Sequence, residues 1–323
     1  MRRLLWKWFL VALLAAMQGA PTAARAADSV KLDYAYYNPV SLLLKKQGWL
    51  EQDLAAKGIT VTWVLSLGSN KALEYLSGSS LDFGSTAGAA ALIGRANGNP
   101  IKTVYVYAHS EWTALVTTKD STIQTLKDLK GRKVAVTRGT DPFIFLLRSL
   151  ASVGLTDKDL TLVPLQHNDG RSALDRGDVD AWAGLDPYMA QAELESGDRL
   201  FFRNPNFNSF GALNVREDFA QAHPELVELV LRDYERARLY ALDHRAELAT
   251  ILAEAAKLSP EVAARQLERT DLSDSTLGAH QLEAVTAAGD VLKASGIIPA
   301  TVDVPTVARE LIDPRFREKL AGR

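Results

Sequence analysis

Apolar and polar positions follow two alternating periods along the first two thirds of the chain. Short alternating or apolar runs, typical of strands, lead into turns rich in Gly, Ser, Asn and Pro, and then into stretches with helical spacing. The first series predicts strands at 30–36, 61–65, 81–84 and 102–107, with helices at 40–47, 70–77 and 87–95. Strands that alternate with helices in this way form parallel sheets with right-handed crossovers.

A second series of the same kind follows, and from about residue 224 the chain is mostly helical. Strands are predicted at 113–118, 133–137, 160–165, 180–183, 200–202 and 211–215, and helices at 126–129, 143–153, 171–176 and 187–195. The fold class is therefore α/β, with two lobes, each a mixed and mainly parallel sheet flanked by helices, and a helical C-terminal layer. We expect crossings near 109–112 and within 207–218, which assigns 27–110 plus 217–323 to lobe one and 111–216 to lobe two.

The N-terminal segment has the pattern of an export signal. Arg2, Arg3 and Lys7 precede an apolar run from Trp8 to Met17, and a small-x-small sequence ends at Ala26. The run is shorter than the roughly 20 residues that a membrane-spanning helix needs. We therefore predict a signal peptide at 1–26 and a soluble protein of the periplasm.

Charge and composition exclude several classes of function. Removal of residues 1–26 takes away four bases and no acids, so the remaining chain has a net charge near −6. A nucleic-acid partner would favour a basic patch, so we expect none. The sequence contains no cysteine, which excludes disulfides, thiolate nucleophiles and a lipid-modified cysteine anchor.

Small or polar turns follow the predicted strands, and this is where ligands bind in open α/β sheets. The N-termini of the helices that follow present unpaired N–H groups and a partial positive charge, both of which suit an anion. Each turn taken alone is equally typical of an ordinary helix cap, but six turns, three in each lobe, favour a cleft site. The candidate ligand-binding residues are Tyr37, Asn38, Gly68, Ser69, Asn70, Ser85, Thr86, Thr140, Asp141, Trp182, Gly184 and Asp186.

The chemistry of these turns narrows the ligand. The turns of lobe one carry no acid, and a fully ionised sulfonate needs hydrogen-bond donors only, whereas a protonated oxyanion also needs an acceptor. Asp141 and Asp186 are either helix caps or groups that face the cleft and bind an amine or hydroxyl of the ligand. We therefore predict a small organic anion such as a sulfonate.

Catalytic and metal-binding patterns are not found in the sequence. The five histidines are scattered, and no pair has metal-ligand spacing. The segment His167–Asp169 is more typical of a capped turn than of a base or metal site. No nucleophile, base and orienting group can be assembled, so we predict no catalytic residues, no metal, no cofactor and no enzymatic activity.

Several segments resemble the aliphatic-sulfonate-binding proteins of ABC importers, within a wider group of taurine, nitrate and thiamine-precursor binders. The resemblance extends over nearly the whole chain after residue 26. It is carried by Tyr36–Pro39, Gly48–Glu51, Leu81–Thr86, Asp128–Ala135, Gly177–Trp182, Asn214–Phe219 and His223–Leu226.

The resemblance implies the two-lobed periplasmic-binding-protein type II fold, with a cleft that closes on its ligand. It also implies an ABC permease in the inner membrane as partner, and a monomer. Here the first turn is Tyr-Tyr-Asn-Pro, whereas in many sulfonate binders it is Gln- or Lys-Gly-rich, so taurine, nitrate or a thiamine precursor remain alternatives. An enzyme on the same fold and the sensory domain of a receptor are the other two possibilities.

Overall fold

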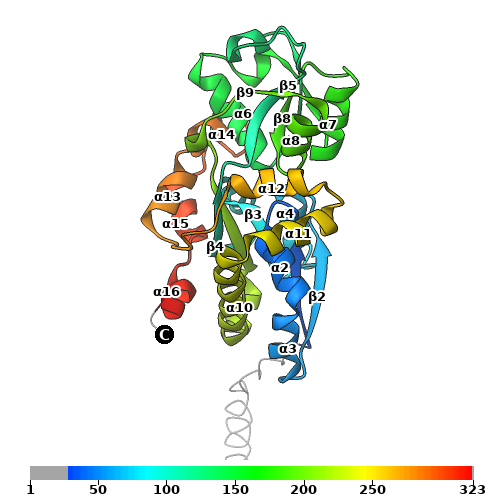
Figure 1. Cartoon of the computed structure of the whole chain (residues 1–323). Coiled ribbons are helices and arrows are strands. Elements are labelled where there is room, and N and C mark those ends of the chain that lie inside the picture. The colour runs from blue at the N-terminus through cyan, green and yellow to red at the C-terminus, as the bar shows by residue number, and fades with distance from the viewer. Residues whose placement is uncertain (1–27, 322–323) are drawn as a thin grey trace, which may run out of the picture.

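The computed structural model describes residues 28–321, so the predicted signal peptide at 1–26 lies outside the described residues. The described chain forms two α/β lobes stacked one above the other (Figure 1). Among the described residues, no helix combines the length and the apolar character that crossing a membrane requires.

The first lobe is built on a six-stranded sheet with the order β11-β4-β10-β3-β1-β2. Its strands are β1 (Ser29–Tyr34), β2 (Thr60–Leu65), β3 (Phe83–Ala87), β4 (Ile101–Ser110), β10 (Phe210–Arg216) and β11 (Thr270–Asp271). β1 pairs in parallel with β2 and β3, whereas β10 runs antiparallel to both β3 and β4. The carboxyl ends of β1, β2 and β3 therefore meet at one edge of the sheet.

The second lobe is built on a five-stranded sheet with the order β7-β6-β8-β5-β9. Its strands are β5 (Thr113–Thr117), β6 (Lys133–Val136), β7 (Thr161–Pro164), β8 (Ala181–Leu185) and β9 (Arg199–Phe202). β6 pairs in parallel with β7 and β8. Fully buried side chains such as Val134, Val136, Phe145 and Leu150 form the core between this sheet and its helices.

The helices follow the strands as the pattern predicts. In the α/β part they are α2 (Pro39–Gln47), α3 (Trp49–Ala55), α4 (Ser69–Ser77), α5 (Gly88–Ala96), α6 (Asp141–Ser152), α7 (His167–Asp175) and α8 (Tyr188–Gln191). Short 3-10 segments occur at Leu126–Leu129, Asp157–Asp159 and Pro205–Phe207, and a π-helical segment at Ala192–Ser196. The helix α3 is not among the sequence predictions.

The C-terminal part is a helical layer that touches both lobes. It contains α9 (Glu217–Ala222), α10 (Pro224–Asp243), α11 (Arg245–Ala256), α12 (Pro260–Glu268), α13 (Ala279–Thr286), α14 (Gly289–Ala294), α15 (Val304–Leu311) and α16 (Arg315–Ala321). α10 packs on α2 in the first lobe, whereas α12 reaches α8 and α14 reaches α6 in the second (Figure 1). This layer therefore bridges the lobes instead of belonging wholly to lobe one.

Two short segments carry the chain between the sheets. The first crossing, Glu111 and Trp112, joins β4 to β5, and the second, residues 203–209, joins β9 to β10. The sequence boundaries placed Phe210–Arg216 at the end of lobe two, but this strand, β10, pairs with β3 and β4 of the first sheet. The return crossing therefore lies before β10.

Candidate ligand-binding site

A small cavity lies between the lobes where the strand-end turns converge. Its lining residues are Tyr37, Ser69, Ala87, Trp112, Thr140, Asp141, Pro142 and Leu185. Lobe one supplies the first three, the first crossing supplies Trp112, and lobe two supplies the rest. Four of the twelve predicted residues, Tyr37, Ser69, Thr140 and Asp141, are therefore brought together around one space.

The cavity has a volume of about 10 Å³, and a single water needs roughly 10–15 Å³ measured in this way. The two lobes are therefore closed on each other. Any organic ligand requires the lobes to part or the lining side chains to move. A larger cavity of about 710 Å³ is lined by residues of both crossings together with residues such as His109, Arg148 and His280, and none of the twelve predicted residues lines it.

Two helices begin at the cavity and direct their N-termini into it. α4 begins at Ser69 after Gly68, and α6 begins at Asp141 after Thr140. The Ser69 Oγ accepts a hydrogen bond of 3.0 Å from the Ala87 N–H, and the Thr140 Oγ1 donates one of 2.6 Å to the Thr137 carbonyl. Both hydroxyls are held in place by local partners. The N–H groups of Lys71 and Phe143 donate to the carbonyls of Gly68 and Thr140 at 3.0 and 3.1 Å, and Pro142 has no N–H. The N–H groups that lack a partner within their helices are those of Ser69, Asn70 and Asp141.

Asn38 and Ser85 form a buried layer beneath the cavity. The Tyr37 hydroxyl donates to the Ser85 carbonyl at 2.9 Å, and the Asn38 Nδ2 donates to the Ser85 Oγ at 2.8 Å. The Ser85 N–H and hydroxyl both donate to Asp33 Oδ1 at 2.8 Å. Burial raises the pKa of Asp33 to about 6, although the Ser85 hydrogen bonds act in the opposite direction. Asp33 is not among the residues predicted from the sequence, because nothing in the run 30–36 indicates that it is buried.

Ser85 and Thr86 lie within β3 and do not form the turn that the sequence indicates. Their partners in β10 are Leu213 and Ala212, and both side chains are fully buried. The Asn214 Nδ2 donates to the Thr86 Oγ1 at 2.8 Å. Neither residue lines the cavity, so they support the site from below.

The remaining predicted glycines and Trp182 also lie outside the cavity lining. Gly184 is within β8, where a Cβ would approach the side chain of Val116 to 2.9 Å, and Trp182 is fully buried against Gly170. Gly68 faces the other lobe, because a Cβ there would lie 2.7 Å from Asn70 Oδ1 and 3.0 Å from His167 Nε2. Gly68 and Asn70 therefore belong to the seam between the lobes.

His167 is a buried neutral group at the start of α7. Burial lowers its pKa to about 3. The Thr137 Oγ1 donates to the Leu165 carbonyl and lies 3.2 Å from His167 Nδ1, so Nδ1 is the protonated ring nitrogen and Nε2 the acceptor. No group of His, Asp or Glu side chains suited to a metal ion occurs within residues 28–321.

Asp141 connects the cavity to both crossings. Its Oδ2 accepts from Trp112 Nε1 at 2.8 Å and from the Ser209 N–H at 2.9 Å, and its Oδ1 accepts from the Ser209 hydroxyl at 2.9 Å. The Ser209 Oγ in turn accepts from the Ala89 N–H, in the first turn of α5, at 3.3 Å. Burial raises the pKa of Asp141, and these hydrogen bonds oppose the rise.

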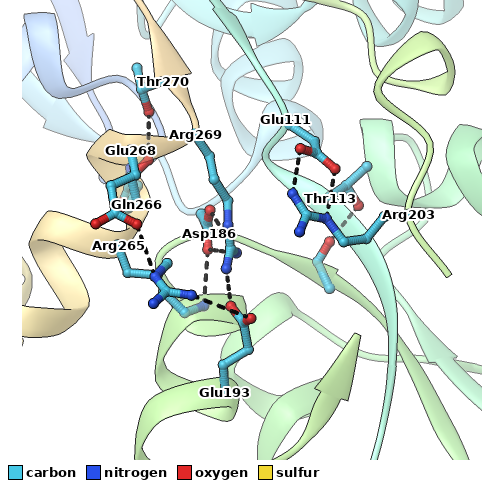
Figure 2. A network of polar contacts seen from close by, with 12 residues as sticks. Glu111, Thr113, Asp186, Glu193, Arg203, Arg265, Gln266, Glu268, Arg269 and Thr270 are labelled. Carbon is cyan, nitrogen blue, oxygen red and sulfur yellow. Dashed lines mark hydrogen bonds and ion pairs between the residues drawn. The ribbon is translucent and has the colours of Figure 1, made fainter. Parts of the chain in front are cut away.

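Asp186 belongs to an ion-pair network that joins the lobes (Figure 2). Arg269, at the end of α12, lies 3.4 Å from both Asp186 oxygens and also contacts Glu193. Arg265 lies 3.8 Å from Glu193. The Asp186 and Arg269 side chains are only 1% and 7% exposed, and burial raises the pKa of Asp186 to about 7 although Arg269 lowers it. Asp186 therefore holds the lobes together and does not line the cavity.

A second ion pair links the two crossings to each other. The Arg203 Nε and Nη2 donate to the two Glu111 oxygens at 2.8 and 2.6 Å (Figure 2). This bidentate pair fixes the relative position of the two segments about which the lobes would rotate.

Two α/β lobes that close over a cavity at the carboxyl ends of their strands define the two-lobed periplasmic-binding-protein type II fold. The chain belongs to the NMT1/THI5 like family, whose model matches residues 43–248.

Known proteins resemble the chain over most of its length. A Bacillus subtilis (strain 168) protein, named for the binding of aliphatic sulfonates, is 27% identical over 281 residues, which is 86% of this chain and 83% of that protein. The alkanesulfonate-binding protein SsuA of Xanthomonas axonopodis pv. citri, bound to MOPS, has a TM-score of 0.80 at 26% identity, covering 89% of this chain and 98% of that chain. The periplasmic aliphatic sulphonate binding protein SsuA of Escherichia coli has a TM-score of 0.77 at 25% identity, covering 90% and 93%.

The fold is also shared with an enzyme. The desulfurization enzyme DSZB has a TM-score of 0.64 at 16% identity and covers 92% of this chain and 99% of that chain. At this identity the likeness concerns the fold alone, so activity has to be judged from the site.

Proposed function

We propose that this protein is the extracytoplasmic solute-binding component of an ABC importer for aliphatic sulfonates. The observation that carries the proposal is the enclosed cavity between the lobes, where helix α4 begins and where Ser69 adds a hydroxyl. Helix N-termini are general anion-binding sites. The sulfonate-binding relatives of similar length support the same assignment.

The lining suits a small molecule with a polar head and an apolar body. The side chains of Ala87, Pro142 and Leu185 and the rings of Tyr37 and Trp112 offer apolar contacts, which is the usual composition of a small-molecule site. A sulfonate headgroup needs only donors, and helix N–H groups supply them. These apolar side chains would contact an alkyl tail, which nitrate and sulfate lack, so the lining favours a sulfonate.

The mechanism that we propose is closure of the two lobes about the crossings. A ligand that touches both lobes binds the closed form better than the open form, and so shifts the population towards closure. In this scheme each lobe is built on one of the two sheets, and β10 belongs to the first sheet. The C-terminal helices α12 and α14 contact both lobes. The closed form then docks on a membrane permease.

Binding without chemical change is the activity that the site supports. The chain has no cysteine, and the neutral His167 directs its free nitrogen towards Gly68 rather than towards a hydroxyl nucleophile. We further propose a periplasmic location after removal of the signal peptide at 1–26, and function as a monomer.

Calorimetry with a series of alkane sulfonates tests the proposal. We expect saturable one-to-one binding of short alkane sulfonates and little heat with sulfate or nitrate. Small-angle scattering should show compaction at saturating ligand. Absence of binding to every sulfonate, or turnover of any of them, would contradict the proposed function.

A further inference from the structure

The charge within the cavity is unusual for a site that receives an anion. Of the eight residues that line it, Asp141 alone carries a formal charge, and this charge is negative. Asp141 is only 2% exposed. A bare alkane sulfonate would therefore share a closed space with a buried carboxylate of the same sign.

The partners of Asp141 leave its charge uncompensated. All three donors that it accepts from, namely Trp112 Nε1 and the N–H and hydroxyl of Ser209, are neutral. Within residues 28–321 it forms no ion pair, and Arg148 influences it only at longer range. Asp186, which is equally buried, differs because Arg269 lies against it. A buried charge without a counter-charge is costly, so the closed form gains from any cation that the ligand supplies.

Contacts for such a cation are offered by the carboxylate and by two aromatic rings. A carboxylate can accept about four hydrogen bonds, and three are in use, which leaves one position on Oδ1. Tyr37 and Trp112 line the same cavity, with their rings edge to face at 6.5 Å between centroids. Aromatic rings attract ammonium groups, and most strongly where water is excluded.

The N-terminus of α4 has the opposite polarity. α4 begins at Ser69, which lines the same cavity, and it has no acidic residue in its first turn. In α6, by contrast, Asp141 is itself the first helical residue and offsets the partial positive charge of that N-terminus. The N-terminus of α4 therefore suits an anion, whereas Asp141 suits a cation.

We propose that the ligand is a zwitterionic aminosulfonate, whose sulfonate lies at the N-terminus of α4 and whose ammonium lies against Asp141, Trp112 and Tyr37. This inference rests on the proposed function, and it names the class of sulfonate for the same cavity. Such a ligand brings no net charge into the closed site. It also places its positive end beside the one carboxylate that has no counter-ion there.

A matched pair of ligands tests the inference. The two compounds are 2-aminoethanesulfonate and propanesulfonate. They differ in one group, because the first has an ammonium where the second has a methyl group of nearly the same size. Calorimetry on the unaltered protein should give at least tenfold tighter binding of the amino compound. In Asp141→Asn this preference should fall to about threefold or less, chiefly because the amino compound binds more weakly, while propanesulfonate binds as well as before or better.

The outcomes separate this inference from the proposed function. If the unaltered protein binds propanesulfonate as tightly as its amino counterpart, the aminosulfonate class is overturned while sulfonate binding stands. If Asp141→Asn keeps the full preference, Asp141 is not the cation-binding group and the inference also fails. If neither sulfonate binds, both fail together. The comparison on the unaltered protein decides the matter even if the variant does not fold.

Discussion

Asp33 is buried completely in the layer beneath the cavity, and its environment makes the stability of the fold depend on pH. Burial raises its pKa to about 6, compared with an ordinary value of 3.8. The folded state therefore binds the proton more tightly than the unfolded state. Its contribution is fully present below about pH 4 and is lost as the pH rises through 6. A shift of this size corresponds to about 3 kcal/mol.

We therefore expect Asp33→Asn to gain stability relative to the unaltered protein as the pH rises from 4 to 7. The amide keeps an oxygen for the two Ser85 donors and removes the buried charge. The difference in thermal midpoint between the two proteins, measured at half-unit steps of pH, checks this. Asp120→Asn, at an exposed position, is the matched control for removal of a carboxylate. A constant difference for Asp33→Asn would mean that Asp33 does not titrate in this range.

Single residues also show what the sequence could and could not predict about the site. Ser69, Thr140 and Asp141 were predictable because each opens a helix directly after a strand. Tyr37 was predictable from the first turn. Ala87, Pro142 and Leu185 have no chemistry that distinguishes them from core residues, and Trp112 lies in a crossing whose direction is set by both sheets. The role of Asp186 depends on Arg269, which is 83 residues away in the sequence.

At the scale of elements, β3 shows where local pattern is overridden by packing. Gly84, Ser85 and Thr86 are typical turn residues, yet the central position of β3 between β1 and β10 holds them extended. Asp33 and Asn214 satisfy their side chains from neighbouring strands. Such partners are distant in sequence, so the pattern alone could not indicate them. Most helices that follow strands, by contrast, were predicted to within a few residues.

Asn214 joins three strands of the first sheet, and its removal should be costly. Its Nδ2 donates to Thr86 Oγ1 at 2.8 Å, and its Oδ1 accepts from Thr103 Oγ1 at 2.6 Å. All three residues are fully buried. Asn214→Leu leaves both hydroxyls without this partner, so we expect a loss of about 2–4 kcal/mol in the free energy of unfolding.

Chemical denaturation of a double-mutant cycle with Thr103→Val measures this contribution. The double variant should lose less stability than the sum of the losses in the two single variants. We expect the difference to be about 1 kcal/mol or more, because the second change removes the hydroxyl that the first leaves unpaired. Simple additivity would show that the two side chains do not stabilise each other.

At the scale of the whole molecule, the two lobes were predicted, but the way in which they are joined was not. Alternating strands and helices indicate two α/β units wherever they occur. The assignment of β10 to the first sheet depends on antiparallel pairing with β3 and β4, which periodicity does not encode. Likewise, α14 carries Val291 to the core of the second lobe although most of the C-terminal layer covers the first.

The Arg269 ion pairs should set the balance between open and closed forms. We expect Asp186 to become exposed to water when the lobes part, whereas in the closed form Arg269 is its counter-charge. Arg269→Gln leaves the carboxylate buried without a counter-charge, which costs about 3–5 kcal/mol in the closed form. We therefore expect a larger radius of gyration by small-angle scattering and weaker sulfonate binding through faster dissociation. Arg265→Gln, whose side chain is 39% exposed, is the matched control and should change little.

The loss of sulfonate affinity in Arg269→Gln should also depend on pH, and the protonation of Asp186 sets its direction. Burial already raises the pKa of this carboxyl group to about 7, and loss of the arginine raises it further in the closed form alone. The closed form then takes up a proton that the open form does not, so acid favours closure. Sulfonate affinity of Arg269→Gln should recover towards that of the unaltered protein between pH 8 and pH 6, and Asp186→Asn in the same background should make it independent of pH. An affinity deficit that stays constant over this range would show that Asp186 is solvated in the closed form, and that Arg269 holds the lobes by packing rather than by charge.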